Sequence, residues 1–395
     1  MAQLSHSLPF ITLRRLAPSA AMLLTLAPGA LLSAAAQPAA PQPANEAITW
    51  HNLSALPLEG KAWTAAKQLY DRLPAKAEGV VRAEVWDLSH DSAGLRYRFV
   101  TDATVLRGRW KLRKVDHLAL PHMPATGVSG LDLYVRDAGS WHWVGAGRPV
   151  KPDVNEAVLV DGLKPGKREY TLYLPLYNGV DSVEIGLPAG AVFEAAPDRY
   201  AGRKPILFYG TSIVQGGCAS RPGMAHSAIL GRMFDWPFIN LGFSGNAKSE
   251  PEVAQLLAAL DPAVFVYDSL PNLNAEEAAQ RVEPFVKAIR VAHPKMPIVL
   301  VENVAYADSP YRQARMDKVL AVNATLRRVY NQMKAGGDAA VFYVPSSSLL
   351  GADGEDTVDG THPTDLGFLR MAEGMAPVLK EALRSAAAES GDSRR

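Results

Sequence analysis

The sequence contains a single cysteine, Cys218, among 395 residues. One cysteine excludes an intramolecular disulfide, so hydrophobic cores alone must hold the fold together. Cys218 follows a serine-containing turn and has no histidine or asparagine partner nearby in sequence, which favours a small residue packed against a helix over a reactive thiol. The chain also lacks a cysteine cluster and a His-x-x-x-His pair, so we expect no metal site.

Positive and negative side chains nearly balance in this sequence, and the formal net charge is +1. This balance argues against a nucleic-acid partner that is recognised by bulk charge. A phosphate-binding glycine loop is also missing, because the glycine-containing segment from Gly210 to Gly217 has no lysine. We therefore expect neither a nucleic-acid partner nor a cofactor.

The sequence also lacks an uninterrupted apolar stretch long enough to span a membrane. The apolar run from Leu16 to Leu32 is short and is broken by two prolines and a glycine. Arg14 and Arg15 precede it, and Ser33-Ala-Ala-Ala36 follows with the small residues of a cleavage site. This pattern predicts a signal peptide over residues 1–36 and a periplasmic or secreted protein without a stable membrane span after cleavage. An uncleaved membrane anchor is the alternative.

Residues 37–47 form a linker rich in proline and alanine, and residues 48–198 have the pattern of β structure. Segments such as Leu95–Val100 and Tyr170–Leu174 alternate apolar with polar residues or are rich in aromatics. Turn residues recur between such segments, as at Lys164-Pro-Gly166. An antiparallel β-sandwich is predicted here, with residues 62–73 as either a short helix or an irregular loop.

Residues 199–385 have a different periodicity, in which short apolar runs alternate with helix-like stretches. The apolar runs are Ile206–Phe208, Phe238–Leu241, Val264–Tyr267, Ile298–Val301 and Val341–Val344, and the helix-like stretches are Glu252–Leu260, Ala275–His293 and Arg312–Lys334. This alternation predicts an α/β domain with a parallel sheet covered by helices on both faces. Ligands bind such sheets at the carboxyl ends of the strands. Residues 386–395 are predicted to be a disordered tail.

Two short segments far apart in the sequence hold the residues for acyl transfer. Ser212 follows the apolar run that ends at Phe208, and Asp359 lies three residues before His362. A serine hydroxyl needs a base to become a nucleophile, and the base needs a partner that orients it. The sequence contains all three, in the order Ser, Asp, His.

Each of these residues also has an ordinary structural interpretation. Ser212 alone would be taken for a helix N-cap, Gly245 for a turn glycine, and Asn272 for a cap of the helix near Ala275. Ser212, Gly245 and Asn272 each follow a predicted strand, so one parallel sheet would bring all three to the same edge. The joint occurrence favours catalysis.

Other candidates are weaker. Arg221 and His226 lie close in sequence to Ser212 and would either contact a substrate or form salt bridges at the surface. His122, together with Asp132 and Tyr134, would face the catalytic edge from the β-rich half. A buried structural role is the stronger interpretation for Asp132 and Tyr134.

Four sequence blocks together resemble the SGNH (GDSL-type) hydrolases. They are Gly210-Thr-Ser212, Asn240-Leu-Gly-Phe-Ser-Gly245-Asn246, Asp268-Ser-Leu-Pro-Asn272 and Asp359-Gly-Thr-His362. Gly130-Leu-Asp-Leu-Tyr134 is similar to the GxDLY signature of a β domain that precedes some of these hydrolases. The resemblance implies an SGNH-type three-layer α/β fold with a central parallel sheet, preceded by a jelly-roll-like antiparallel β-sandwich.

The resemblance also implies roles for individual residues. Ser212 would be the nucleophile, His362 the base and Asp359 its orienting partner, while Ser212, Gly245 and Asn272 would form the oxyanion hole. Arg221 and His122 would be available for substrate binding. Two positions depart from the family pattern: Thr211 stands where an aspartate is expected, and Leu270-Pro-Asn272 replaces a glycine-containing block.

These observations predict an exported serine esterase that hydrolyses a small-molecule or saccharide ester. Export and the aromatic residues of the β-rich half, such as Trp141 and Trp143, favour O-acetyl or other short acyl groups on a carbohydrate. An acyltransferase with the same triad is one alternative, because water and an alcohol would use the same residues. A carbohydrate-binding protein with a vestigial hydrolase domain is the other.

Overall fold

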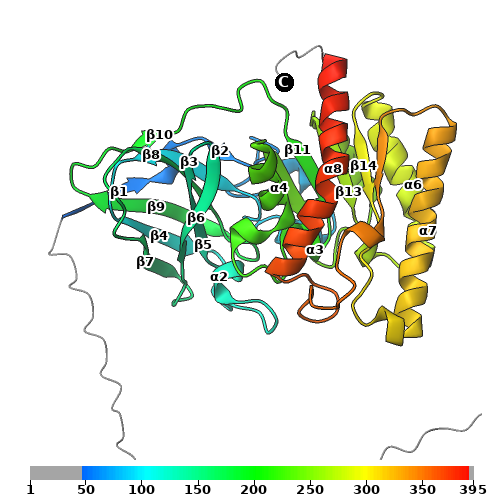
Figure 1. The fold of residues 1–395 in the computed structure, drawn as a ribbon, viewed down its shortest axis with the longest axis horizontal. Coiled ribbons are helices and arrows are strands. Elements are labelled where there is room, and N and C mark those ends of the chain that lie inside the picture. Colours follow the sequence, from blue (N-terminus) through cyan, green and yellow to red (C-terminus); the bar gives the residue numbers. More distant parts are fainter. Residues whose placement is uncertain (1–46, 391–395) are drawn as a thin grey trace, which may run out of the picture. The chain divides into compact units, whose positions relative to one another are not determined.

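The computed structural model describes residues 47–390, and these residues belong to one compact unit (Figure 1). The predicted signal peptide over 1–36 and the linker, except for its last residue, lie outside the described residues. Within the described range, no helix combines the length and the apolar character that crossing a membrane requires.

The first half consists mainly of strands. They are β1 (Ile48–Asn52), β2 (Leu58–Glu59), β3 (Arg96–Thr101), β4 (Leu106–Leu112), β5 (Leu131–Asp137), β6 (Ser140–Gly147), β7 (Val154–Val160), β8 (Arg168–Tyr173), β9 (Val180–Pro188) and β10 (Glu194–Ala195), with the short helices α1 (Ala83–Leu88) and α2 (Ala125–Val128). Residues 62–73 contain no helix, so the irregular loop is the correct alternative for this segment.

These strands form two antiparallel sheets in the order β1-β9-β4-β7 and β10-β3-β8-β5-β6. Leaving aside the two-residue strands β2 and β10, the strand order is first-eighth-third-sixth in one sheet and second-seventh-fourth-fifth in the other. This is the order of a jelly roll. Side chains from both sheets, including Trp110, Leu133, Tyr170 and Ile185, share one buried core. The jelly-roll-like sandwich expected from the sequence is therefore confirmed.

The second half alternates strands and helices. Its strands are β11 (Ile206–Gly210), β12 (Phe238–Gly242), β13 (Val264–Asp268), β14 (Ile298–Val301) and β15 (Val341–Val344), and its helices are α3 (Ser212–Gln215), α4 (His226–Phe234), α5 (Pro251–Ala258), α6 (Ala275–Ala292), α7 (Gln313–Ala335) and α8 (Asp365–Ser390). The five strands are parallel in the order β12-β11-β13-β14-β15. The chain order therefore reverses beside β11, and such a switch point is where doubly wound sheets bind ligands.

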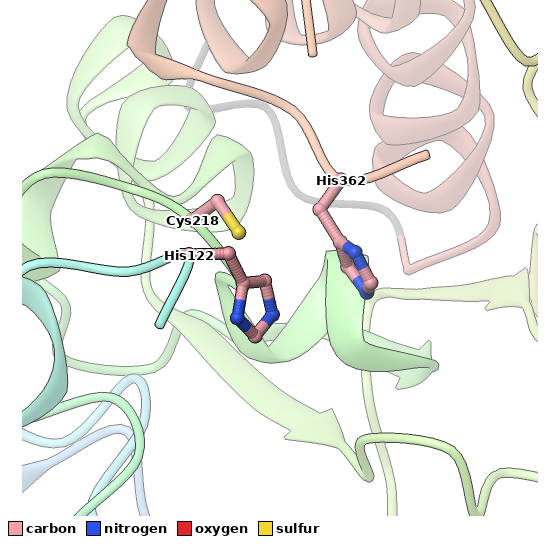
Figure 2. Close-up of side chains that lie close together, drawn as sticks. All are labelled: His122, Cys218 and His362. Atoms are coloured by element: carbon pink, nitrogen blue, oxygen red, sulfur yellow. The ribbon is translucent and has the colours of Figure 1, made fainter. Parts of the chain in front are cut away.

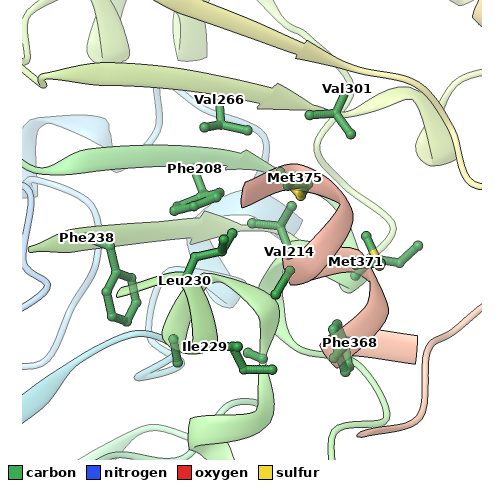
Figure 3. Packing of buried hydrophobic residues seen from close by; sticks show 14 of the residues in the cluster. Phe208, Val214, Ile229, Leu230, Phe238, Val266, Val301, Phe368, Met371 and Met375 are labelled. Atoms are coloured by element: carbon green, nitrogen blue, oxygen red, sulfur yellow. The ribbon is translucent and has the colours of Figure 1, made fainter. Parts of the chain in front are cut away.

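Alternate residues of each strand in the parallel sheet face opposite layers of helices. Phe208, Val266 and Val301 pack toward α4 and α8, as Figure 3 shows. Their strand neighbours, such as Leu207 and Phe265, pack toward α5, α6 and α7. The expected three-layer arrangement is thus confirmed. Helix α8 ends at Ser390, so it extends into the segment for which a disordered tail is predicted.

Buried polar contacts join the sandwich half to the parallel sheet. Arg72 is almost fully buried, and its guanidinium donates to the carbonyl oxygens of Gly242 at 2.8 Å and Asn240 at 3.2 Å. It also donates to the carbonyls of Leu88 and Asp91. Burial lowers the pKa of Arg72 to about 10, and the nearby carboxylate of Asp91 partly offsets this effect. A single side chain thus fixes α1 to the end of strand β12.

Candidate active site

Ser212 occupies the first position of α3, directly after the sharp turn that follows β11. The turn needs Gly210, because a Cβ atom there would lie 2.2 Å from the carbonyl oxygen of Asp268. Thr211 caps the helix, with its hydroxyl accepting from the Ile213 N–H at 3.2 Å. The capping role is therefore filled by Thr211, and the side chain of Ser212 is free for another contact.

The structure brings Ser212, His362 and Asp359 into one hydrogen-bonded chain. Ser212 Oγ lies 2.9 Å from His362 Nε2, and His362 Nδ1 lies 2.7 Å from Asp359 Oδ2. The other carboxylate oxygen, Oδ1, accepts from the backbone N–H groups of His362 at 2.8 Å and Thr361 at 2.9 Å. The loop backbone therefore orients the Asp359 carboxylate independently of its contact with the His362 ring.

The charge on Asp359 determines which ring nitrogen of His362 carries a proton. Burial acts to raise the pKa of Asp359, but the backbone N–H and ring of His362 and the N–H of Thr361 outweigh it, and the pKa falls below its usual value. An ionised carboxylate can only accept hydrogen bonds, so His362 Nδ1 must be the donor. Neutral His362 then presents the lone pair of Nε2 to the Ser212 hydroxyl.

The residues expected to bind an oxyanion lie at the same edge of the sheet. The backbone N–H of Ser212 is at the start of a helix, where such groups have no partner within the helix. Gly245 follows β12 with φ of 69°. Asn272 closes a short turn after β13, and its amide oxygen is satisfied when it accepts from the N–H groups of Asn246 at 3.0 Å and Ala247 at 3.1 Å. Its NH₂ group then points away from these donors.

Asn272 does not cap helix α6. Asn274 does so, by accepting from the N–H of Glu277 at 2.9 Å in a capping box. The ordinary structural interpretation of Asn272 as an N-cap is thus wrong.

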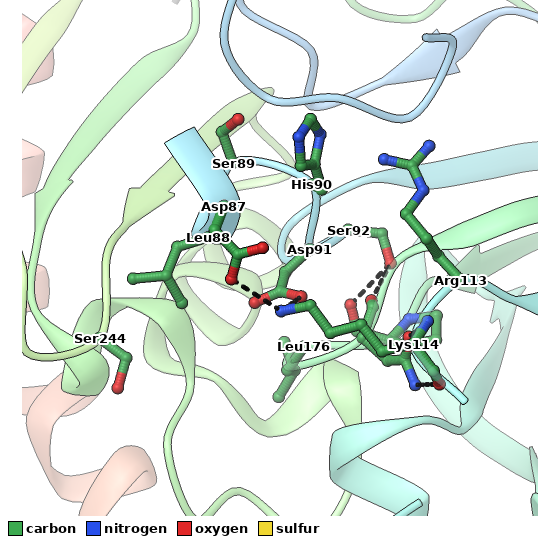
Figure 4. A network of polar contacts seen from close by, with 12 residues as sticks. Asp87, Leu88, Ser89, His90, Asp91, Ser92, Arg113, Lys114, Leu176 and Ser244 are labelled. Carbon is green, nitrogen blue, oxygen red and sulfur yellow. Dashed lines mark hydrogen bonds and ion pairs between the residues drawn. The ribbon is translucent and has the colours of Figure 1, made fainter. Parts of the chain in front are cut away.

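Gln215 is a site residue that the sequence did not single out. Its buried side chain accepts from the N–H of Ser244, next to Gly245, at 2.9 Å. Its Nε2 donates to Asp91 Oδ2 at 3.0 Å, and Lys114 Nζ lies 2.9 Å from the other Asp91 oxygen (Figure 4). The sandwich half therefore helps to fix the turn that contains Gly245. Only the position of Gln215 three residues after Ser212 could have signalled this role.

Arg221 lies in an ion pair with the GxDLY motif. Its guanidinium donates to Asp132 Oδ2 at 3.0 Å and to the hydroxyl of Tyr134 at 2.5 Å. Asp132 is fully buried and also accepts from the N–H of Gly223 at 2.8 Å and from Trp143 Nε1 at 2.9 Å. The motif thus binds the loop that follows α3. Burial raises the pKa of Asp132, although Arg221 opposes this shift.

His226 lies in the interior of the protein, whereas a substrate contact or a surface salt bridge is expected from the sequence. It is completely buried, stacked on Phe368 with ring centroids 5.9 Å apart, and its Nε2 lies 4.0 Å from Asp268 Oδ2. Burial lowers the pKa of His226 to about 4 and raises that of Asp268 to about 7. The expectation of a substrate contact or surface salt bridge is therefore wrong, because the residues of α4 that pack on the sheet include this histidine.

His122 and Cys218 both lie near His362. The rings of His122 and His362 meet edge to face, with centroids 5.4 Å apart. Cys218 is buried in a loop after α3 with φ of 77°, so it is not part of a helix. Burial, together with the charge of Asp359, raises the pKa of its thiol to about 12.

An open groove of about 570 Å³ lies beside these residues. Leu120, Tyr177 and Ser244 line it together with Glu84 and Asp87 of α1. The hydroxyl of Tyr177 donates to the carbonyl of Ser212 at 3.2 Å. The groove therefore adjoins the Gly245 turn through Ser244, and Tyr177 connects it to the backbone of Ser212. Both halves of the chain contribute to it.

The fold and this arrangement of residues define an ester hydrolase, and comparisons with known families give the same class. The model of the GDSL-like lipase/acylhydrolase family matches residues 203–380, and that of the GxDLY N-terminus of SGNH-hydrolase-type esterases matches residues 48–193. The chain belongs to the GDSL-like lipase/acylhydrolase family and carries the GxDLY N-terminal domain. No protein of curated function matches the chain by sequence.

Solved structures extend the likeness over most of the chain. A protein from Bacteroides ovatus ATCC 8483 described as a GDSL-like lipase is 35% identical, with a TM-score of 0.80 over 85% of this chain and 98% of its own. A salicylyl-acyltransferase from a tetracycline biosynthetic pathway is 21% identical, with a TM-score of 0.66 over 85% of this chain and 97% of its own. A family two carbohydrate esterase from Cellvibrio japonicus is 13% identical, with a TM-score of 0.54 over 86% and 99%. The last two share the fold.

Proposed function

We propose that this protein is an exported serine esterase that removes O-acetyl or other short acyl groups from a carbohydrate. The observation that carries the proposal is the hydrogen-bonded chain in which Ser212 Oγ lies 2.9 Å from His362 Nε2 and His362 Nδ1 lies 2.7 Å from Asp359. The three side chains have the order and polarity that nucleophilic catalysis on an ester requires.

The proposed reaction assigns roles to the residues of this site. Ser212 Oγ attacks the ester carbonyl while its proton moves to His362 Nε2, and the same proton then goes to the departing alcohol. A water molecule then attacks the acyl-enzyme while His362 takes its proton, and this proton passes to Ser212 Oγ as the acid is released. The backbone N–H groups of Ser212 and Gly245 and the amide of Asn272 stabilise the negative oxygen in both steps, at about 3 kcal/mol for each well-placed donor.

The groove beside Ser212 supports a hydroxyl-rich alcohol component. Its volume of about 570 Å³ suits a small ligand, and it is open to solvent. The exposed carboxylates of Glu84 and Asp87 are acceptors for sugar hydroxyl groups. Carbohydrate esterases of the same fold are consistent with this substrate class. Export follows from the predicted signal peptide over residues 1–36.

The direct test is Ser212→Ala, compared with Ser347→Ala at an exposed serine away from the groove. We expect Ser212→Ala to lower the turnover of p-nitrophenyl acetate by about a thousandfold or more, because the nucleophile is lost. The Ser347→Ala variant should keep its activity. Full turnover by Ser212→Ala would reject the assignment. Deacylation of acetylated xylan and of acetylated simple alcohols, measured side by side, tests the substrate class.

Transfer of the acyl group to an alcohol in place of water is the second candidate. The salicylyl-acyltransferase with a TM-score of 0.66 has the same fold over nearly all of its length. Product analysis in the presence of an added sugar acceptor separates the two reactions, since transfer yields a new ester and hydrolysis yields the free acid. A carbohydrate-binding protein with a vestigial site would release no acid from any ester.

A further inference from the structure

We propose that His122, Cys218 and His362 together bind a divalent transition-metal ion of the zinc type, and that this ion inhibits the enzyme reversibly. The three possible ligand atoms all lie within 4.8 Å of one another. Figure 2 shows the three side chains coming together from separate segments of the chain. The inhibition, although not the binding, rests on the role proposed above for His362.

The donor atoms match the chemistry of Zn²⁺. Imidazole nitrogen and thiolate sulfur are its common protein ligands, at about 2.0–2.1 Å and 2.3 Å in a tetrahedral arrangement. Ligand atoms around such an ion are about 3.5 Å apart by the same geometry, so binding requires movements of about 1 Å. His122 can supply this movement. It is exposed at the tip of a hairpin closed by two hydrogen bonds of 3.0 Å between Leu120 and Met123.

The surroundings of His362 are those of a metal ligand. Its Nδ1 donates to Asp359 at 2.7 Å, which fixes the tautomer whose lone pair is on Nε2, the nitrogen that faces Ser212 Oγ at 2.9 Å. Histidines that bind metals in proteins usually have such a carboxylate partner on the second nitrogen. The negative charge of Asp359 also attracts a cation to this position.

Binding would switch off the proposed base. His362 Nε2 cannot accept the proton of Ser212 while its lone pair is bound to a metal ion. The thiol proton of Cys218 passes to solvent as the sulfur–metal bond forms, so the step requires no oxidant or reductant. A water molecule or the Ser212 hydroxyl would occupy the fourth position. The ion would therefore compete with catalysis without any change in the fold.

Cobalt spectroscopy tests the site without reference to activity. Co²⁺ takes the place of zinc in tetrahedral sites, and a cysteine ligand adds a thiolate-to-cobalt charge-transfer band in the near ultraviolet. Because Cys218 is the only cysteine in the sequence, such a band in the full chain can come from no other residue. We expect the band in the wild-type protein and in Ser212→Ala, and we expect its loss in Cys218→Ser.

Histidine variants keep the test decisive if Cys218→Ser fails to fold. His122 is exposed, so His122→Gln is expected to fold, and it should weaken cobalt binding about tenfold or more because a ligand is lost. His142→Gln, at an exposed histidine of β6, is the matched control and should bind cobalt like the wild type. The absence of a charge-transfer band, or equal affinity in the two histidine variants, would overturn the proposal.

Inhibition by Zn²⁺ is measured on each variant relative to its own rate without metal. The wild type and His142→Gln should lose activity at micromolar to millimolar Zn²⁺ and regain it with EDTA. Cys218→Ser and His122→Gln should require at least about ten times more zinc. Cobalt binding in a protein that hydrolyses no ester would leave the metal site standing and reject only the proposed function. Equal inhibition of all variants would reject this site as its cause.

Discussion

Replacing Asp359 with asparagine should inactivate the enzyme more completely than replacing it with alanine. The asparagine has the same shape, but one of its two terminal groups is a donor. Two backbone N–H groups, from Thr361 and His362, point at Oδ1 of the aspartate at 2.9 and 2.8 Å. Turning an NH₂ group toward them would leave both without an acceptor, at about 1–3 kcal/mol each.

The asparagine oxygen therefore stays on these backbone donors, and its NH₂ group faces Nδ1 of His362. The ring must then accept at Nδ1 and carry its proton on Nε2, where it can no longer take the proton of Ser212. A wrong tautomer of this kind costs about 10³–10⁴-fold in kcat, which corresponds to about 4–5 kcal/mol. In Asp359→Ala, water can solvate Nδ1 and the productive tautomer remains accessible. Its loss should be at least about tenfold smaller.

The assay is kcat for p-nitrophenyl acetate, with the His362 tautomer read independently from ¹⁵N chemical shifts of the ring. Asp353→Asn is the matched control, because Asp353 is an exposed carboxylate of the same loop that pairs with Arg370. It should retain activity within about twofold, since surface ion pairs contribute little. The reasoning is refuted if Asp359→Asn is as active as Asp359→Ala, or if its ring still carries the proton on Nδ1.

Two further predictions concern stability. Asp132→Ala leaves buried donors of Arg221 and Gly223 without an acceptor. This variant should lower the free energy of unfolding, measured by urea titration, by about 3–5 kcal/mol. The control is Glu156→Gln, at the exposed pair with Arg109, which should change the free energy of unfolding by less than about 1 kcal/mol. Equal effects would contradict the burial argument.

The second of these predictions concerns the pH dependence of stability. The pKa of His226 is lowered to about 4, so between about pH 4 and 6.5 the unfolded chain binds this proton and the folded chain does not, and stability rises with pH. The pKa of Asp268 is raised to about 7, so over nearly the same window the folded chain holds the proton and stability falls with pH. Asp268→Asn should therefore gain about 3 kcal/mol of stability between pH 4 and 6.5 relative to the wild-type profile, and an unchanged profile would contradict the pKa values.

The alternation of apolar runs and helical stretches was sufficient to predict the parallel sheet. Each of the five predicted runs lies in a strand, because fully buried parallel strands have long apolar runs, such as Ile206–Tyr209 and Val264–Tyr267. The helix predicted over Ala275–His293 is observed as α6, Ala275–Ala292. Its start is encoded locally by the Asn274 capping box, which explains why the boundary is accurate.

Contacts between distant segments could not be predicted in the same way. His226 lies on the apolar face of α4, but its burial depends on Phe368 of α8, far along the chain. The approach of Cys218 to His122 and His362 likewise depends on a hairpin of the sandwich half. Sequence spacing carries no information about such meetings, because each partner satisfies its local pattern without the other.

The sandwich half is part of the structural support of the site. Asp132 holds the loop after α3, Arg72 holds the end of β12, and Asp91 holds Gln215, which binds the Gly245 turn. Residues 199–385 alone would expose the backbone carbonyls that Arg72 now satisfies and would leave Gln215 without its carboxylate partner. The geometry at Ser212 is therefore a property of the two halves together, and the GxDLY motif is one of the contacts through which the first half imposes it.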